Sequence, residues 1–488
     1  MVMQKERLAF NFGPGTVPGQ RAIDAALAAE RPTFATASFA EPRDWGYAGL
    51  IAFTAVLLLR PQDQFKVLTP FHLAEICAFA GIAPMLFHRF TRNLGVFRIT
   101  TETIGLIAFS AVILATAPFS IWPGGAFEVF SDYLKIVVVF VLMLNTLTTV
   151  KRIEQLTWLI LVCCGYIAAR GVFDYARGVN LVEGGRVAGA VGGIFGNPND
   201  LALNMVTFLP AALMVALTQR HSMLRRLTAA GIVALMLATV VFTKSRGGAL
   251  GLGAVLVAML FLGRRIRPGF AAMALGCVLI ATPFLPSTFW DRMSSIFNEE
   301  QDKTKYTGSS EARRVVMEEG IDAFLKFPLT GVGAGQFKNY NPPERKERWR
   351  ETHNAPIQVA AETGIFGLLV FSFLIVRGVT AAASTRRLLE PPRKKSAPDA
   401  LRVVMADDDR QMLYAYTAAM TAGLVGWFTC ALFASVAYSW TFYYLLALIV
   451  AARELARSRL AAARALVKGS KPAVATHGFS RRPARGVA

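Results

Sequence analysis

The sequence is short of charged residues for its length. Only 17% of its 488 residues are Asp, Glu, Lys or Arg, whereas 54% are hydrophobic, and the mean hydropathy is +0.43. Soluble domains carry a charge at about a quarter of their positions. Many apolar runs here approach the roughly 20 residues that cross a bilayer. The composition therefore excludes an ordinary soluble domain and predicts an all-α polytopic membrane protein.

Acidic residues are scarcer than basic residues, and this imbalance indicates which partners the protein binds. The chain has 52 Lys and Arg against 32 Asp and Glu, which gives a formal net charge of +20. The basic residues lie in short loops between apolar runs, where the positive-inside rule places them. Anionic lipid headgroups are sufficient partners for this charge. We therefore expect membrane lipids, and no nucleic acid, as partners.

Cysteines and cofactor motifs are also sparse. The five cysteines lie inside apolar runs without metal-ligand spacing, so we interpret them as small apolar side chains. There is no P-loop, dinucleotide fingerprint or metal-ligating His pair. The acidic run at 407–409 precedes an apolar span and is interpreted as a helix cap and solvated face. We therefore expect no cofactor and no metal site.

Hydropathy predicts about twelve transmembrane helices. Lys and Arg gather in alternate loops, which places both termini in the cytoplasm, and an even number of spans agrees with that placement. The first 44 residues lack the apolar core of a signal peptide. The expected spans are 46–60, 68–87, 100–118, 134–150, 155–175, 199–218, 227–243, 248–263, 269–285, 355–376, 412–436 and 440–457. The expected organisation is a cytoplasmic extension at 1–44, nine spans within 45–285, a long, partly helical periplasmic loop at 286–354, three spans within 355–460, and a basic cytoplasmic tail at 461–488.

The long loop carries helix signals of its own. Ser310 is typical of a helix start because Ser caps helices, and Pro328 is typical of a helix that ends just before it. The apolar face of this helix is expected at Val315, Val316, Ala323 and Phe324. A tight, permissive loop is then predicted by Gly331, Gly333 and Gly335.

A polar stretch meets an apolar helix at 351–367, and His353 and Asn354 lie at that junction. On a helix, Asn354, Gln358 and Glu362 share one face because they are spaced by four residues. A titratable His at the mouth of a membrane helix, above a polar stripe, indicates a site of chemistry. The alternative is that the stripe only packs against neighbouring polar helices.

Three further features lie on the same predicted outer side. In the glycine-rich segment 186–202, the glycines let the backbone approach a ligand and Arg186 can bind a phosphate. Asn199 or Asp200 can cap the next span. The alternative is that this segment is only a turn followed by a helix cap. Arg246 lies between two apolar runs, where it is either functional or an interfacial snorkelling side chain. Arg313 lies on the loop helix, where an exposed Arg is normally a solvated face.

Together these features suit one reaction. Several guanidinium groups can hold a diphosphate without a metal, and a neutral His can take a proton from an attacking hydroxyl near pH 7. The basic stretch 341–350 either meets anionic groups of an acceptor or contacts lipid headgroups.

The order of these motifs resembles the O-antigen ligase and O-antigen polymerase superfamily of bacterial membrane glycosyltransferases. The matching pieces are Gly-Asn-Pro-Asn-Asp-Leu-Ala at 196–202, Ser-Arg-Gly-Gly at 245–248, Arg313 with Pro-Leu-Thr-Gly-Val-Gly-Ala-Gly-Gln-Phe at 328–337, and His-Asn followed by Glu-Thr-Gly between 353 and 364. The strong part of the resemblance covers roughly 183–376. It departs from the family in the long spacing between Arg186 and the Asn-Pro-Asn turn.

The resemblance implies a GT-C-like fold in the bacterial inner membrane and a metal-independent, inverting transfer on the periplasmic side. The donor would be a glycan on undecaprenyl diphosphate, and the acceptor lipid A–core in ligases or another lipid-linked glycan in polymerases. His353 would be the catalytic base, and Arg246, Arg313 and, less directly, Arg186 would bind the diphosphate. The supporting residues would be Asn354, Gln358, Glu362, Asn199, Gly331 and Gly333.

A secondary transporter is the alternative from another class. Twelve spans fit that class, but transporters commonly show matching halves, and the sequence has no internal repeat. Its polar and cationic features also gather at one predicted face rather than at mid-span. The choice between ligase and polymerase stays open, because nothing in the sequence names the acceptor.

Overall fold

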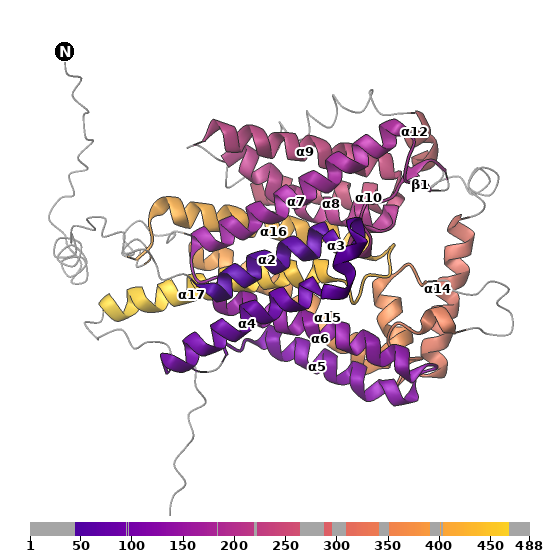
Figure 1. Ribbon diagram of the computed structural model, residues 1–488, viewed down its shortest axis with the longest axis horizontal. Coiled ribbons are helices and arrows are strands. Elements are labelled where there is room, and N and C mark those ends of the chain that lie inside the picture. Colours follow the sequence, from indigo (N-terminus) through magenta and orange to yellow (C-terminus); the bar gives the residue numbers. More distant parts are fainter. Residues whose placement is uncertain are drawn as a thin grey trace, which may run out of the picture.

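The structure is a computed structural model, and it is almost entirely helical (Figure 1). Its only sheet within the described residues is an antiparallel hairpin of β1 (Leu181–Val182) and β2 (Arg186–Val187), in which Leu181 pairs with Val187. The residues that it describes are 44–93, 95, 97–182, 184–218, 222–263, 287–294, 309–340, 351–390, 401 and 404–467.

The long helices are α2 (Trp45–Leu59), α4 (Leu73–Thr91), α5 (Thr101–Thr116), α6 (Pro123–Thr146), α7 (Val150–Arg177), α8 (Pro198–Thr218), α9 (Met223–Thr243), α10 (Arg246–Gly263), α14 (Ser309–Lys326), α15 (Ala355–Leu389), α16 (Asp407–Ala431) and α17 (Trp440–Val467). The shorter helices are α3 (Pro61–Gln64), α12 (Ser287–Ser294) and the 3-10 turns η1 (Lys66–Phe71), η2 (Ala117–Phe119), η3 (Gly193–Phe195) and η5 (Phe337–Asn339).

Every expected span apart from 269–285 overlaps one of these helices, and 269–285 lies outside the described residues. In the part of the chain that is described, six helices are long and apolar enough to cross a membrane. The prediction of a mainly helical membrane protein is thereby confirmed, while the number twelve stays a prediction. Positions 1–43, the basic stretch 341–350 and the tail beyond 467 lie outside the described residues.

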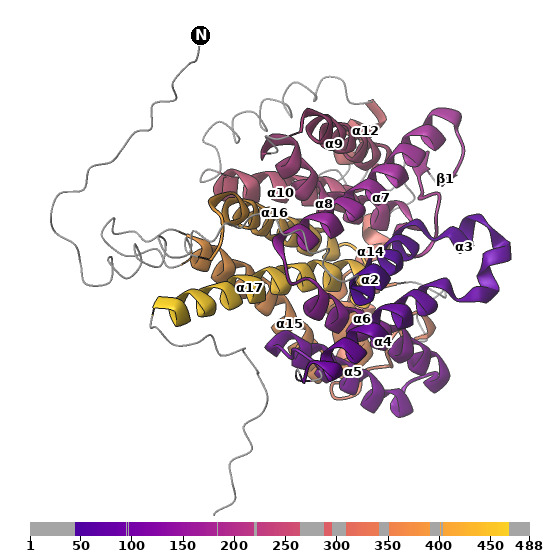
Figure 2. The same cartoon turned by 60° about the vertical axis from the view of Figure 1, so that its left-hand side comes forward.

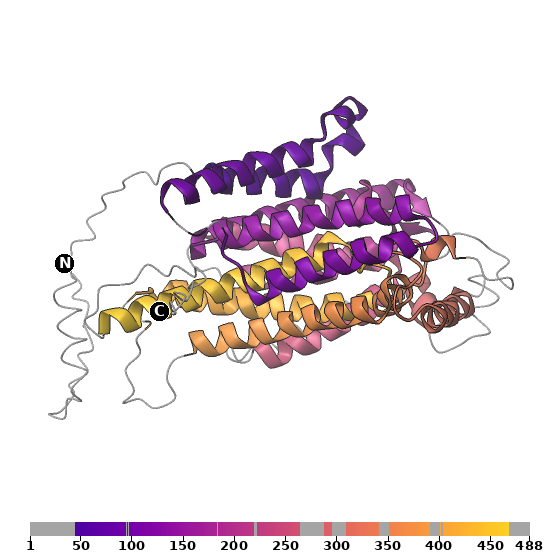
Figure 3. The same cartoon turned by 90° about the horizontal axis from the view of Figure 1, so that it is seen from below.

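The helices form a bundle in three groups. α2, α16 and α17 lie in the middle, α7 to α10 lie on one flank, and α4, α5, α6 and α15 lie on the other (Figures 1 and 2). Most bundle helices run along one long axis, and α14 lies at one end of it (Figure 3). The β1–β2 hairpin, α3 and α12 lie at that same end, which we call the hairpin end.

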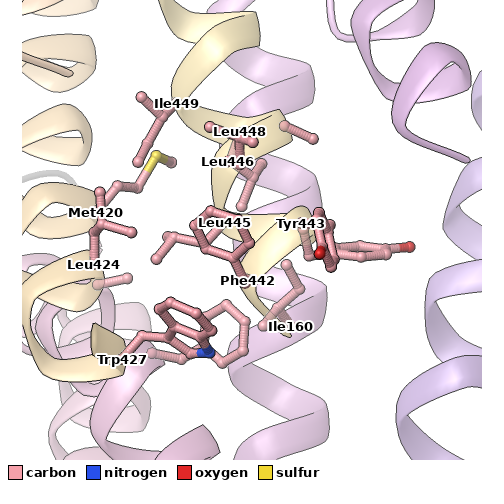
Figure 4. Packing of buried hydrophobic residues seen from close by; sticks show 14 of the residues in the cluster. Ile160, Met420, Leu424, Trp427, Phe442, Tyr443, Leu445, Leu446, Leu448 and Ile449 are labelled. Atoms are coloured by element: carbon pink, nitrogen blue, oxygen red, sulfur yellow. The ribbon is translucent and has the colours of Figure 1, made fainter. Parts of the chain in front are cut away.

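Aromatic packing holds the middle of the bundle together (Figure 4). Trp427 of α16 stacks on Phe442 of α17, with ring centroids 4.5 Å apart. Tyr443 then meets Tyr133 of α6 edge to face at 5.1 Å. All four side chains are almost completely buried, so α16 and α17 provide a rigid support for the turn between them.

A buried ion cluster ties three helices at the end opposite the hairpin. Glu102 of α5 is completely buried and accepts two hydrogen bonds from Arg453 of α17, at 2.8 and 2.7 Å. Arg377 of α15 adds a contact of 2.7 Å to the same carboxylate. Because a buried charge is costly without its partner, this cluster fixes α5 against α15 and α17.

Candidate active site

Two segments that are far apart in the sequence, 186–199 and 243–246, meet at the hairpin end. The Arg186 side chain donates to the Thr243 carbonyl at 3.0 Å and to Asn199 Oδ1 at 2.7 Å. The same Asn199 oxygen accepts from Ser245 Oγ at 2.9 Å. The structure therefore brings the predicted residues Arg186 and Asn199 directly beside the start of α10, where Arg246 is the first residue.

Local capping explains why these segments turn where they do. Asn197 Oδ1 accepts the backbone N–H groups of Asn199 and Asp200, both at 2.9 Å, so Asn197 caps α8. The prediction that Asn199 or Asp200 caps this helix is wrong, because the Asn199 side chain is directed to Arg186 instead. Ser245 caps α10 by accepting from the Gly248 N–H at 3.2 Å.

The turn between α9 and α10 is cationic and enclosed. Lys244 has a left-handed backbone, with φ of 48°, and ends α9. Its Nζ donates to the Gly184 carbonyl at 3.1 Å, and the residue is only 8% exposed. Desolvation lowers the pKa of Lys244, and the nearby positive charges of Arg292 and Arg186 lower it further. Lys244 and Arg292 are not among the site residues predicted from the sequence.

The start of α15 carries the predicted base. Asn354 caps this helix by accepting from the Ile357 N–H at 3.0 Å, and its amide nitrogen donates to the Leu432 carbonyl at 3.2 Å. His353 lies just before the cap in a left-handed conformation, with φ of 49°. Its backbone N–H donates to Ser435 Oγ at 3.0 Å. The position of His353 is thus fixed by residues 432–439, which join α16 to α17.

The same connecting turn, residues 432–439, also touches the start of α10. A side chain added at Gly247 would lie 2.9 Å from Phe433 Cβ, and Cys430 Sγ donates to the Gly247 carbonyl at 3.4 Å. Arg246 and His353 therefore flank one turn, although they are more than a hundred residues apart in the sequence.

The polar stripe of α15 holds neighbouring backbone. Gln358 Oε1 accepts from the Ala437 N–H of the connecting turn at 3.2 Å. Glu362 accepts from the N–H groups of Gly335 at 2.9 Å and Phe337 at 3.4 Å. These contacts favour a positioning role for Gln358 and Glu362, because each fixes a loop at the hairpin end.

The glycine loop at 331–335 docks into a break in α15. Gly364 has φ of 65° and ψ of −163°, which interrupts the helix. Near this break, the carbonyls of Ala361 and Glu362 accept from Val332 and Gly333, both at 2.9 Å, and Ile365 donates to Pro328 at 2.8 Å. A side chain at Gly331 would lie 2.3 Å from the α15 backbone, so only glycine permits this approach.

α14 brings Arg313 to the same region. Val316, Gly320 and Ala323 form the stripe of α14 that packs inward, and a side chain added at Gly320 would lie 2.7 Å from Ile357 of α15. Arg313 is half-buried and lies on this stripe, three residues before Val316. That Arg313 serves the same site as His353 stays a prediction.

Glu351 adds a carboxylate beside the start of α15. Desolvation by surrounding protein raises the pKa of its carboxyl, and the Lys338 ammonium opposes this shift. The Glu351 charge also lies within electrostatic range of Asp200 and Glu362. The hairpin end therefore holds acidic groups near α8 and α15 as well as cations near α9 and α10.

Three helices, α8, α10 and α15, begin in this region, and each helix start presents backbone N–H groups and a partial positive charge. Such helix starts favour anions. A cavity of about 570 Å³ lies between α2, α4 and α6, and its lining includes Arg60, Lys135 and Tyr438. Tyr438 belongs to the connecting turn, so the cavity reaches the segment that links Arg246 and His353.

Residues 231–372 match the family model of O-antigen ligases. This segment, which is less than a third of the chain, is therefore similar to O-antigen ligases. It runs from within α9 to the first half of α15 and contains Arg246, Arg313 and His353, whereas Arg186 and Asn199 precede it. The resemblance to this superfamily of membrane glycosyltransferases is thereby confirmed. No curated protein matches the chain.

Proposed function

We propose that this protein is an inverting, metal-independent glycosyltransferase of the O-antigen ligase type, which works on the periplasmic side of the bacterial inner membrane. It transfers a glycan from undecaprenyl diphosphate to a hydroxyl group of lipid A–core. The observation that carries the proposal is the meeting of Arg186, Asn199 and Ser245 beside Arg246, joined through one turn to His353. The match of residues 231–372 to the family model of O-antigen ligases supports this assignment.

In this proposal, His353 takes the proton of the acceptor hydroxyl as the oxygen attacks the anomeric carbon of the donor. The bond between that carbon and the diphosphate oxygen breaks, and undecaprenyl diphosphate leaves. Arg246, Arg313 and Arg186 stabilise the charge that develops on the leaving group. A single displacement inverts the anomeric configuration.

The remaining predicted residues act on position rather than on the reacting atoms. Asn354 and Gln358 fix the connecting turn against α15. Glu362 holds the glycine loop, in which Gly331 and Gly333 allow the chain to approach α15. A catalytic group needs support of this kind, because small displacements of a reacting group cost much of its effect.

A transfer assay with purified protein tests the proposal and its polymerase alternative. The donor is a synthetic undecaprenyl-diphosphate oligosaccharide, supplied in EDTA with or without lipid A–core. A product that forms only with lipid A–core supports the ligase assignment. Extension of the donor glycan without lipid A–core would instead identify a polymerase, and no transfer by folded protein with several donor glycans would contradict both.

A further inference from the structure

Three cationic side chains surround the Gly184–Gly185 turn of the β1–β2 hairpin. Lys244 Nζ donates to the Gly184 carbonyl at 3.1 Å. A Cβ atom added at Gly184 would lie 3.7 Å from Arg292 Nη1 and 3.9 Å from Arg186 Cγ. At Gly185 an added Cβ would lie 3.4 Å from Lys244 Nζ. The three cations come from β2, the α9–α10 turn and α12, so the fold itself assembles them.

This cluster is enclosed, which makes it unlike an ordinary basic surface. Lys244 and Arg292 are each only 8% exposed. Like charges held close together in a partly desolvated place repel one another. The lowered pKa of Lys244, which is caused by desolvation, Arg292 and Arg186, is consistent with that repulsion. A phosphate group has the charge opposite to that of all three side chains, so it would be attracted to the cluster.

The turn of the hairpin is built from glycine at the two positions nearest these cations. Gly184 and Gly185 have φ of 76° and 62°, values that suit glycine, and neither carries a side chain over the cluster. Lys244 is separated from Arg246 by a single residue, and Arg186 is bonded to the α9 end and to Asn199. An anion at the cluster would therefore lie next to the start of α10.

We propose that Arg186, Lys244 and Arg292 form an anion subsite that binds a phosphate group of the substrate next to Arg246. The inference rests on the proposed function, in which the substrate carries phosphate groups. Two sources share this chemistry: the diphosphate of the lipid-linked donor, and a phosphate on the acceptor. Lys244 and Arg292 would be binding residues additional to the arginines expected from the family resemblance.

Direct binding of inorganic pyrophosphate to the purified full-length protein tests the subsite without any transfer reaction. Isothermal titration calorimetry would compare wild type with Lys244→Met, Arg292→Gln, Arg292→Lys and Lys66→Met. Lys66 is a matched control, since it is an exposed lysine in η1 at the hairpin end. We expect pyrophosphate affinity to fall at least tenfold in the first two variants, to be retained better in Arg292→Lys than in Arg292→Gln, and to stay unchanged in Lys66→Met.

Steady-state transfer then separates the two sources. A raised KM for the donor in Lys244→Met, with kcat nearly unchanged, identifies the donor diphosphate, and a raised KM for the acceptor identifies an acceptor phosphate. A third result is that the wild-type protein transfers no glycan but binds pyrophosphate, and that Lys244→Met and Arg292→Gln lose this binding. In that case the subsite is supported and the proposed function is wrong. Wild-type pyrophosphate affinity in both folded variants would overturn the subsite.

Discussion

Replacing Gly364 with alanine should undo the docking of the glycine loop on α15. Gly364 has φ of 65° and ψ of −163°, a backbone region that is essentially limited to glycine. The new Cβ atom would also lie 2.6 Å from the carbonyl carbon and oxygen of Leu329 and 2.7 Å from the Pro328 oxygen. These are backbone atoms, so no side-chain rotation can relieve the contacts.

The two effects give the expected magnitude. A side chain forced into this backbone region costs about 1–3 kcal/mol, and overpacking against fixed neighbours costs a further ~1–3 kcal/mol. We therefore expect Gly364→Ala to lower the free energy of unfolding by about 2–6 kcal/mol. The loss should be accompanied by loss of transfer activity, because the loop that Glu362 holds would no longer be seated.

Unfolding in mixed micelles measures this change, with Gly253→Ala as the matched control. Gly253 is exposed in α10, and nothing lies within 4 Å of the position that its Cβ would take. That substitution should be neutral or stabilising by up to about 1 kcal/mol, since alanine is the better helix former. If Gly364→Ala unfolds like Gly253→Ala and keeps its activity, the described docking is wrong.

Three further substitutions test other parts of the structure. Glu102→Ala should destabilise the protein by about 3–5 kcal/mol in the same unfolding assay, because it removes the two hydrogen bonds that the buried Arg453 donates to Glu102 and leaves it only Glu454; a loss below 1 kcal/mol would argue against the ion cluster. Asn354→Ala should cost about 1 kcal/mol through the lost helix cap, and Asn354→Ser should recover much of it; equal stability of the two variants would contradict the cap. Glu351→Gln should match wild type below pH 4.5 and melt higher than wild type as pH rises, because the raised pKa of Glu351 means that its ionisation disfavours the folded state; a lower melting temperature for Glu351→Gln at pH 8 would refute this sign.

Much of the helical framework could be predicted from the sequence because apolar runs of span length have few other structures available. α8, α9 and α10 lie within four residues of the positions that hydropathy gives them. α15 begins at the expected residue 355 but continues to Leu389, into the segment expected to be a basic loop. α14 begins at Ser309, one residue before the expected start at Ser310. Its apolar face was predicted less well, since Val315 is 46% exposed while Val316 is buried. The helix packs inward along a narrower stripe than its composition suggests.

The contacts that assemble the candidate site could not be predicted in the same way. Arg186, Asn199 and Ser245 are bonded together although 46 residues separate the last two, and hydropathy contains no information on such pairing. Nothing in the sequence marks Arg292 as a site residue, because its proximity to Gly184 depends on how α12 packs against the hairpin. The Thr-Lys-Ser-Arg-Gly-Gly run at 243–248 could be recognised in the sequence as a candidate segment. The residues that surround Lys244 in the fold could not be predicted from it.

For the polar stripe of α15, the sequence predicts which residues share a helix face but not what their side chains contact. Its spacing placed Gln358 and Glu362 on one face of the helix, and the structure shows that both are buried, at 8% and 3% exposed. The sequence left open whether the stripe serves chemistry or packing. The hydrogen bonds to Ala437, Gly335 and Phe337 show which backbone groups these side chains hold, and that information exists only in the folded chain.

The most direct test of the proposed site is the rate of glycan transfer by His353→Ala, measured with purified protein beside wild type and His88→Ala. His88 is an exposed histidine near the end of α4, so its loss should leave the rate unchanged. Removing a general base typically costs about 10²–10⁴-fold, and we expect a loss of that size for His353→Ala in protein that unfolds like wild type. If a folded His353→Ala variant transfers glycan at the wild-type rate, then His353 does not take the acceptor proton.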